Sequence, residues 1–329
     1  MPIFRKRNGS RRVTPDELIQ ELHRSVDGLA EDGVSRADLK LLSRTLRELR
    51  HAFRIFDSLR DRPKVTVFGS ARVAPGSPPF RQAEAFGREM SGRGWFVVTG
   101  AGEGIMKAAH LGAGRDRSIG VNILLPFEQQ DNPVMAGSPR LIQTKYFFTR
   151  KLLFLKESSG IALFPGGFGT MDEAFETLTL LQTGKTHPFP LVLVDEPGGD
   201  FWAAWQRSTV EILLARGLIS PDDLALYRIT DSVEEAVGEI EGYYRVFHSS
   251  RFVGERFVIR VRKPIGEEAL REMNAGFADL LSEGSFLQED PLPEEADDPD
   301  LAHLKRIVFP FNCRNFGRLR LLIDFLNRQ

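Results

Sequence analysis

Three glycine-rich turns constrain the fold of this chain more than any other feature, because each stands between a short apolar segment and a helix-like segment. They are Gly69-Ser70-Ala71-Arg72, Gly100-Ala101-Gly102-Glu103-Gly104 and Pro165-Gly166-Gly167-Phe168-Gly169-Thr170. Short apolar runs that alternate with helices are typical of parallel strands covered by helices on both faces. Since the carboxyl ends of parallel strands share one edge of the sheet, we expect the three turns to meet there.

The alternation extends over residues 62–249, for which we predict an α/β fold with a Rossmann-like, doubly wound parallel sheet. The predicted strands cover residues 64–68, 95–99, 118–124, 160–164 and 189–194. The predicted helices cover residues 81–92, 104–112, 145–156, 170–182 and 201–216. The helix over residues 145–156 is apolar almost all round, which favours a largely buried position.

Two extensions flank this predicted catalytic domain. Residues 1–61 are predicted to form a basic tail and a helical hairpin packed on the main domain, and Thr14-Pro15-Asp16-Glu17 has the pattern of a helix start. Residues 250–329 are predicted to form a small α+β extension, with strands over 252–263 and 306–311 and helices over 267–282 and 314–327. The acidic stretch 288–300, QEDPLPEEADDPD, indicates a flexible linker or an exposed loop.

Composition excludes several classes of protein. The 44 Lys and Arg residues balance 45 Asp and Glu residues, so no net charge attracts nucleic acid or a membrane surface. The only cysteine, Cys313, excludes a disulfide framework and a cysteine-based zinc site, and it is expected to be a small buried apolar residue. No apolar run is long enough to span a membrane, and the N-terminus lacks the apolar core of a secretory signal. We therefore expect a cytoplasmic protein without nucleic-acid or membrane partners.

The glycine turns favour a phosphate ligand. Glycine allows backbone N–H groups to approach an anion closely, and the helix that follows each turn directs its unpaired N–H groups and positive dipole end to the same point. Thr170 adds a hydroxyl at the start of one of these helices. The segment from Gly166 to Thr170 is therefore the predicted anion site.

Two charged residues are candidates for chemistry next to this anion site. Arg150 lies in the middle of the apolar helix, where it either reaches solvent or a structural partner, or projects into the ligand cleft. Asp172 and Glu173 lie in the first turn of a helix, where the dipole favours carboxylates. Asp172 is expected only to stabilise the start of the helix through this dipole. Glu173 lies one turn beyond the glycines, where it could orient a water or stabilise an oxocarbenium-like transition state at an attached sugar.

Two familiar nucleotide motifs are incomplete. Ile105 stands where the dinucleotide fingerprint requires a third glycine, and no acidic residue ends the strand over residues 118–124. A dinucleotide oxidoreductase is therefore a weak alternative. Gly184-Lys185-Thr186 imitates the end of a P-loop, but Thr179 occupies the position of the required glycine. We predict that Gly184 is a helix C-cap.

The segment PGGFGTMDE, residues 165–173, resembles the PGGxGTxxE signature of the LOG (Lonely Guy) family of cytokinin-type nucleoside-monophosphate phosphoribohydrolases, which is often mislabelled lysine decarboxylase-like. Similar motifs are VFGSAR, TGAGEGIMKAA, LPFEQQDNP, YFFTRK and LTLLQTGK, so that the resemblance spans residues 64–216. No pyridoxal-binding lysine context is visible, so the sequence does not support a decarboxylase.

The resemblance implies hydrolysis of the N-glycosidic bond of a nucleoside 5′-monophosphate, such as AMP, to a free base and ribose 5-phosphate. It implies no metal or organic cofactor, and a homodimer or larger homo-oligomer. Arg150 and Glu173 are the implied catalytic residues. The implied substrate-binding residues are Gly69, Ser70, Gly100, Gly102, Gly104, Met106, Glu128, Lys151, Gly166, Gly167, Gly169, Thr170 and Thr179.

The sequence departs from the family pattern at two positions. Ala101 stands where the family usually has glycine, which would place a methyl group near the ligand edge, and Lys107 stands where glutamate is frequent. Both changes bear on the preferred base more than on the reaction. The two extensions are not part of the minimal family, and they leave a second hypothesis open: a non-catalytic nucleotide sensor or carrier of the same fold.

Overall fold

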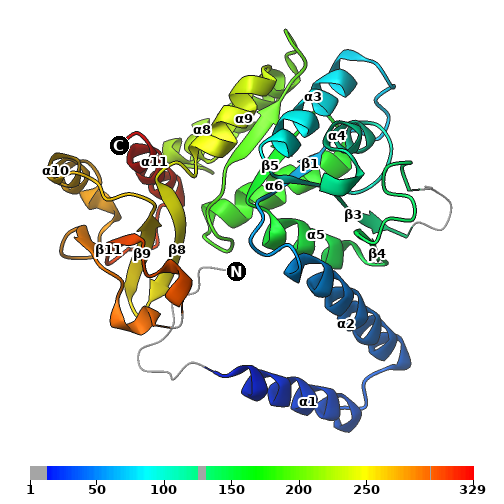
Figure 1. The fold of residues 1–329 in the computed structure, drawn as a ribbon, viewed down its shortest axis with the longest axis horizontal. Helices are drawn as coiled ribbons and strands as arrows, with labels where there is room; N and C mark the ends of the chain where they lie inside the picture. The colour runs from blue at the N-terminus through cyan, green and yellow to red at the C-terminus, as the bar shows by residue number, and fades with distance from the viewer. Residues whose placement is uncertain (1–12, 125–130, 297) are drawn as a thin grey trace.

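The computed structural model describes residues 13–124, 131–296 and 298–329. It contains a seven-stranded parallel sheet and a separate four-stranded antiparallel sheet, with helices on both faces of the larger one (Figure 1). The predicted α/β doubly wound fold is confirmed. The predicted basic tail, residues 1–12, and Glu128 lie outside the described residues.

The large sheet has the strand order β4-β3-β2-β1-β5-β6-β7. Its strands are β1 Lys64–Phe68, β2 Phe96–Thr99, β3 Ser118–Ile123, β4 Leu141–Thr144, β5 Gly160–Leu163, β6 Leu191–Val194 and β7 Arg228–Thr230. The chain builds outward from β1 to β4 and then returns to place β5 on the other side of β1. Strand order therefore reverses between β1 and β5, and in such sheets ligands bind outside the carboxyl ends of the strands at this point.

Apolar side chains alternate between the two faces of the large sheet, so each face carries its own core. In β1, Val65 and Val67 contribute to one core, whereas Phe68 contributes to the other. The first face is covered by α3 Pro78–Gly92, α4 Ile105–Ala113 and α9 Val233–Gly242. The second face is covered mainly by α5 Phe147–Glu157, α6 Phe168–Gln182 and α7 Phe201–Trp205, with a π-helical turn Gln206–Val210 and α8 Glu211–Ala215 continuing α7.

The two N-terminal helices differ in how they meet the body of the protein. Helix α2, Arg36–Asp57, packs Ala52 and Phe56 into the second core, and Glu48 accepts a hydrogen bond of 2.9 Å from the backbone N–H of Lys145. Helix α1, Pro15–Glu31, has the capping box predicted at Thr14, but it has no buried residue and stands clear of the rest of the described chain (Figure 1). The expected hairpin packed on the main domain is therefore wrong for α1.

The smaller sheet has the order β10-β11-β9-β8 and is antiparallel. Its elements are β8 Phe247–Val253, β9 Arg256–Val261, α10 Glu267–Gly276, β10 Leu287–Glu289, β11 Lys305–Phe309 and α11 Phe316–Asn327. The single strand expected over residues 252–263 is instead a hairpin that turns at Gly254, with φ +60°. The domain boundary expected between residues 249 and 250 consequently falls inside β8, and the C-terminal unit begins a few residues earlier.

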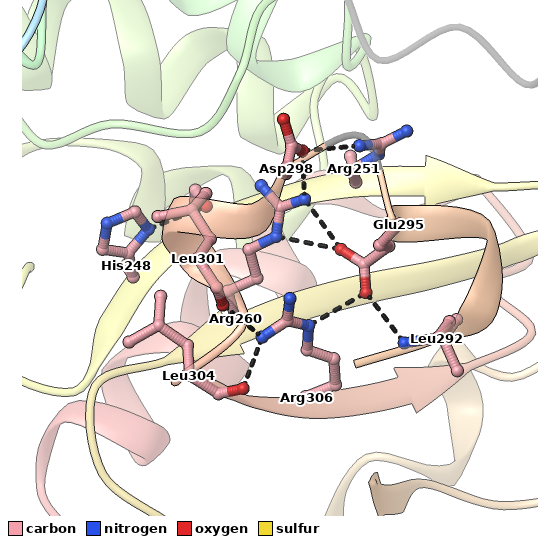
Figure 2. A network of polar contacts seen from close by, with 10 residues as sticks. His248, Arg251, Arg260, Leu292, Glu295, Asp298, Leu301, Leu304 and Arg306 are labelled. Carbon is pink, nitrogen blue, oxygen red and sulfur yellow. Dashed lines mark hydrogen bonds and ion pairs between the residues drawn. The ribbon is translucent and has the colours of Figure 1, made fainter. Parts of the chain in front are cut away.

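The described residues of the acidic stretch, 288–296 and 298–300, form ion pairs with the small sheet, contrary to the expected flexible linker or exposed loop (Figure 2). Glu295 is 3% exposed and accepts hydrogen bonds of 2.7 Å from Nη2 of Arg260 and 2.9 Å from Nε of Arg306. Asp298 accepts further bonds from Arg251 at 2.7 Å and Arg260 at 2.6 Å. The stretch therefore covers the arginine-bearing face of the small sheet, while α10 and α11 cover the other face.

The C-terminal unit packs on the end of α6. The C-cap of this helix is Thr183, and Gly184, the predicted cap, is the residue after it; Gly184 has φ +64°, and a Cβ atom there would lie 2.1 Å from the ring of Phe316. Asn315 also donates a hydrogen bond of 2.7 Å to Asp222, in the short helix Pro221–Leu226. Within the described ranges, no helix is long and apolar enough to cross a membrane.

Candidate active site

A cavity of about 1220 Å³ opens at the carboxyl ends of β1, β2 and β5, at the point where strand order reverses. It brings together most of the residues that the sequence singled out: Gly69, Ser70, Gly100, Met106, Arg150, Gly166, Gly167, Gly169, Thr170 and Glu173.

The three glycine turns interlock to form one wall of this cavity. The backbone N–H of Ser70 donates to the carbonyl of Pro165 at 3.1 Å, and the carbonyl of Ser70 accepts from the N–H of Ile105 at 3.1 Å. A Cβ atom on Gly104, which has φ +63°, would lie 2.2 Å from the carbonyl oxygen of Ser70. A Cβ atom on Gly166 would lie 2.1 Å from Oγ1 of Thr170. Glycine is required at both positions, because backbone of another turn fills the side-chain space at Gly104 and the side chain of Thr170, in the same turn, fills it at Gly166.

The N-terminus of α6 faces the cavity without a side-chain cap. The helix begins at Phe168 after the N-cap residue Gly167, whose lack of a side chain leaves the first N–H groups without a capping acceptor. Gly167, Gly169 and Thr170 all line the cavity. Uncapped N–H groups and the positive end of the helix dipole form a site for an anion such as phosphate.

Arg150 lies in the cavity wall, so the functional alternative for this residue is favoured over a solvent-directed one. Its guanidinium carbon lies 5.1 Å from the ring centre of Phe147 and 5.7 Å from that of Phe154. Its Nε is buried without a hydrogen-bond partner among the described residues. Burial lowers the pKa of Arg150 and Glu173 opposes this effect, but the group stays charged. A buried cation with an unused donor favours binding of an anionic ligand.

Glu173 lies one turn into α6 and is 5% exposed. Burial raises the pKa of its carboxyl group to about 7, although the nearby charges of Lys151 and Arg150 act in the opposite direction. A carboxyl group that titrates near neutral pH can exchange a proton with a reacting group in either direction. Its position and its pKa therefore both suit acid–base chemistry.

Four other predicted substrate-binding residues do not line the cavity: Gly102, Gly104, Lys151 and Thr179. Lys151 pairs with Asp172 at 2.8 Å and Glu176 at 2.9 Å, on the neighbouring helix α6. Thr179 is exposed and donates a hydrogen bond to the carbonyl of its own helix four residues earlier. Gly104, with φ +63°, shapes the second glycine turn. Gly102 lies in the same turn, and its carbonyl accepts a hydrogen bond from Asn132 behind the cavity wall.

Two buried residues that were not among the predicted site residues, Asn132 and His110, support Gly102 from behind the cavity wall, and Asn132 lies in the motif LPFEQQDNP. The side-chain amide of Asn132 donates to the carbonyl of Gly102 at 3.2 Å and lies 3.2 Å from Nδ1 of His110. Burial lowers the pKa of His110 to about 4, so its ring is neutral at physiological pH. Asn132 and His110 therefore fix the second glycine turn from the side opposite the cavity.

Three expectations about side-chain placement need correction. Helix α5 is not largely buried, since Phe147, Phe148 and Leu152 are about half exposed. The methyl group of Ala101 is fully buried on the β3 side, where Gly120 leaves room for it, and does not lie at the ligand edge. Lys107 pairs with Glu103 at 2.9 Å outside the cavity. Neither departure from the family pattern therefore alters the cavity lining directly.

The far wall of the cavity was not foreseen from sequence. It comes from α7 and the π-helical turn after it, and it combines aromatic and polar side chains: Asp200, Phe201, Trp205 and Ser208. These residues follow β6, whose end carries no glycine motif, so no local pattern links them to the site. Among the described residues, no group of three His, Cys, Asp or Glu side chains could hold a metal ion.

Known proteins with similar sequences or structures were compared with this chain. Residues 103–240 match the family model described as "Possible lysine decarboxylase". Over 160 residues, the chain is 31% identical to the cytokinin riboside 5′-monophosphate phosphoribohydrolase of Mycobacterium tuberculosis, covering 47% of this chain and 81% of that protein.

Two solved structures are similar to about half of this chain. The molybdenum cofactor binding protein of Rippkaea orientalis has 18% identity and a TM-score of 0.40, and the match covers 55% of this chain and 96% of that one. The molybdenum cofactor carrier protein of Chlamydomonas reinhardtii has 18% identity and a TM-score of 0.38, with the same coverage.

The similarity to the protein from Mycobacterium tuberculosis shows the family of this chain, because the alignment spans most of that protein at more than 30% identity. The signature PGGFGTMDE agrees with this assignment, and its residues line the cavity from Gly166 to Glu173. The chain belongs to the LOG family.

Proposed function

We propose that this protein hydrolyses the N-glycosidic bond of a nucleoside 5′-monophosphate, giving a free base and ribose 5-phosphate. The observation that carries the proposal is that one cavity is lined by Arg150, Glu173 and the uncapped N-terminus of α6. An anion site, an unpaired guanidinium and a carboxyl group with a pKa of about 7 are the groups that this reaction requires.

The cavity suggests how the substrate is oriented. The phosphate binds at the backbone N–H groups from Gly167 to Thr170, and Arg150 neutralises its charge. The ribose then lies over Glu173, and the base extends toward the aromatic wall that includes Phe201 and Trp205. The phosphate thereby meets backbone donors and a cation, and the base meets aromatic side chains.

The reaction follows from this arrangement. The Glu173 carboxylate accepts a proton from a water molecule as the water oxygen attacks the anomeric carbon. The carbon–nitrogen bond breaks through an oxocarbenium-like transition state, and its electron pair leaves with the base nitrogen, which takes up a proton from solvent. Until it has accepted the proton, the negative charge of Glu173 stabilises the positive charge that develops on the ribose.

Base release tests the proposal directly. Purified full-length protein is incubated with AMP, GMP, CMP and a prenylated AMP, and free base and ribose 5-phosphate are measured by chromatography and mass spectrometry. We expect both products in equal amounts from at least one substrate. Failure of folded protein to release base from any of the four would contradict the proposal. Tight binding with the nucleotide recovered intact would instead identify the alternative sensor or carrier.

Arg150→Ala should raise KM at least tenfold and also lower kcat, because a guanidinium that contacts the phosphate also holds the ribose over Glu173. Steady-state base release measures both constants. Lys156→Ala is the matched control, since Lys156 is a cation on the same helix but does not line the cavity. An Arg150 variant with unchanged constants would show that the guanidinium has no part in binding substrate.

The rate should depend on the ionisation of Glu173. Its pKa in the folded protein is raised to about 7, so the carboxylate that accepts the proton is lost as pH falls below that value. We expect kcat/KM to drop about tenfold per pH unit on the acid side and to level off above pH 7 to 8. A pH profile measured from 5 to 9 checks this. A rate that rises toward acid pH would assign Glu173 the role of a general acid.

A further inference from the structure

Helices α1 and α2 carry exposed apolar stripes with the spacing of a coiled-coil seam. On α1 the stripe repeats at intervals of three, four and three residues: Ile19, Leu22, Val26 and Leu29. On α2 it repeats at intervals of three, four, three and four residues: Leu39, Leu42, Leu46, Leu49 and Phe53, of which Leu49 is only partly exposed because it also packs against the second core. Leu22, Val26 and Leu46 are each more than half exposed. This heptad spacing is what allows two helices to pack along a continuous seam.

The two helices also carry opposite charge. Helix α1 has five acidic residues and one arginine, which gives a net charge of −4. Helix α2 has six basic residues and three acidic ones, which gives a net charge of +3. Flanking charges of opposite sign favour pairing of one helix type with the other, and disfavour pairing of each with its own kind.

Only α2 is fixed to the body of the protein. Ala52, Phe56 and the Glu48 contact to Lys145 hold one side of it against the large sheet domain, so its outward stripe is a rigid template. A turn over residues 32–35, in which Gly33 has φ +64°, connects α1 to α2, and α1 projects away from that template (Figure 1). A lone helix of this length that buries nothing is marginal in water, so α1 requires an apolar surface to cover it.

We propose that α1 of each chain docks on the outward stripe of α2 in a second copy, so that two chains exchange their N-terminal arms. Eight large apolar residues of the two helices are 40–55% exposed in the single chain, and an interface between two copies would cover them: Leu18, Ile19, Leu22, Val26, Leu39, Leu42, Leu46 and Phe53. Reciprocal exchange covers both stripes of both chains, and it gives a closed two-fold assembly. The acidic arm and the basic template make the contact specific for a second copy of this chain.

Cross-linking between distinguishable chains tests the exchange without any nucleotide, so its outcome is independent of the proposed hydrolase activity. Both chains carry Cys313→Ser; one also carries Leu22→Cys, and the other, lengthened by an affinity tag, carries Leu46→Cys. A flexible bis-maleimide reagent should join the two different chains. The control Gln20→Cys, on the exposed side of α1 away from the seam, should give much less product.

A chain that carries both new cysteines decides between the two ways in which α1 can be covered. Products that link two chains support the exchange, whereas products confined to one chain would show that α1 folds back on its own α2, which overturns the proposal.

Sedimentation equilibrium provides a second measurement. Leu22→Glu should weaken self-association about a hundred-fold, because it places an unpaired charge in an apolar seam. Gln20→Glu adds the same charge off the seam and should not. Equal dissociation constants for the two variants would contradict the proposal.

Discussion

Replacing Glu173 with glutamine should lower kcat for base release by about a thousandfold and change the affinity for AMP only a few-fold. Glutamine keeps the size of the side chain but cannot accept the proton of the attacking water, and general base catalysis contributes about 10²–10⁴-fold to a rate. The phosphate site, by contrast, consists of backbone groups and Arg150, which the substitution does not touch. Base release measures kcat, and calorimetric titration with AMP measures affinity.

The stability of this variant provides an internal control. The pKa of Glu173 is raised from 4.5 in the unfolded chain to about 7 in the folded protein, so the folded state binds more protons between these values. The free energy of unfolding therefore falls as pH rises through that window, and the buried carboxylate is a destabilising group above pH 7. Glu173→Gln removes this charge and should be at least as stable as the wild type at pH 8.

Glu176→Gln, on the same helix, is the matched control for the rate measurement and should keep a near-normal kcat. A parallel loss of rate and affinity would show that Glu173 holds the ligand and does not act on the water.

Replacing Glu295 with alanine should lower the free energy of unfolding by about 3–5 kcal/mol, because it leaves two buried arginines without their shared carboxylate. Arg260 and Arg306 are 6% and 0% exposed (Figure 2). Burial alone would raise the pKa of Glu295, but hydrogen bonds from Arg306 and Arg260 keep it below its usual value. The carboxylate is therefore charged at neutral pH, and its loss leaves Arg306 without a carboxylate partner and Arg260 with Asp298 alone.

The neighbouring Glu294 provides the comparison. It forms an exposed ion pair with Arg256 at 3.2 Å, so Glu294→Ala should cost less than about 1 kcal/mol. Urea denaturation at pH 7, monitored by circular dichroism, gives both values. Similar small losses for the two variants would mean that residues 288–300 are the loose acidic segment that their composition indicates.

The contrast between composition and structure in this segment shows where sequence patterns fail. Its prolines and acidic residues are typical of a linker, but Arg260 and Arg306, which order it, lie on two strands of a different part of the unit. Local composition carries no information on such pairing. The five strands that were predicted have what local patterns detect: short apolar runs such as KVTVF, bounded by glycine or proline.

Two strands of the large sheet escaped prediction for a related reason. β4, Leu141–Thr144, and β7, Arg228–Thr230, are the two edge strands, and they have four and three residues. Each edge strand has only one neighbour, and both contain exposed polar side chains, so they lack a continuous apolar run. The glycine turns, Arg150 and Glu173 could be selected because backbone chemistry and helix position are local properties. The aromatic far wall of the cavity could not, because it depends on how α7 packs over the sheet.

Phe316, from the C-terminal unit, packs against Gly184 and thereby covers the end of α6. The end of α6 and the segment after it present Leu181 and Phe189 toward the C-terminal unit, where Phe316 and Leu319 face them across a narrow gap. One end of helix α6 thus lines the candidate active site, and its other end packs against the C-terminal unit. A shorter relative that lacks the C-terminal unit must either carry polar side chains at these positions or cover them with another subunit. In this chain the C-terminal unit covers these positions, as a second subunit would, and because it belongs to the same chain it is always present in a one-to-one ratio.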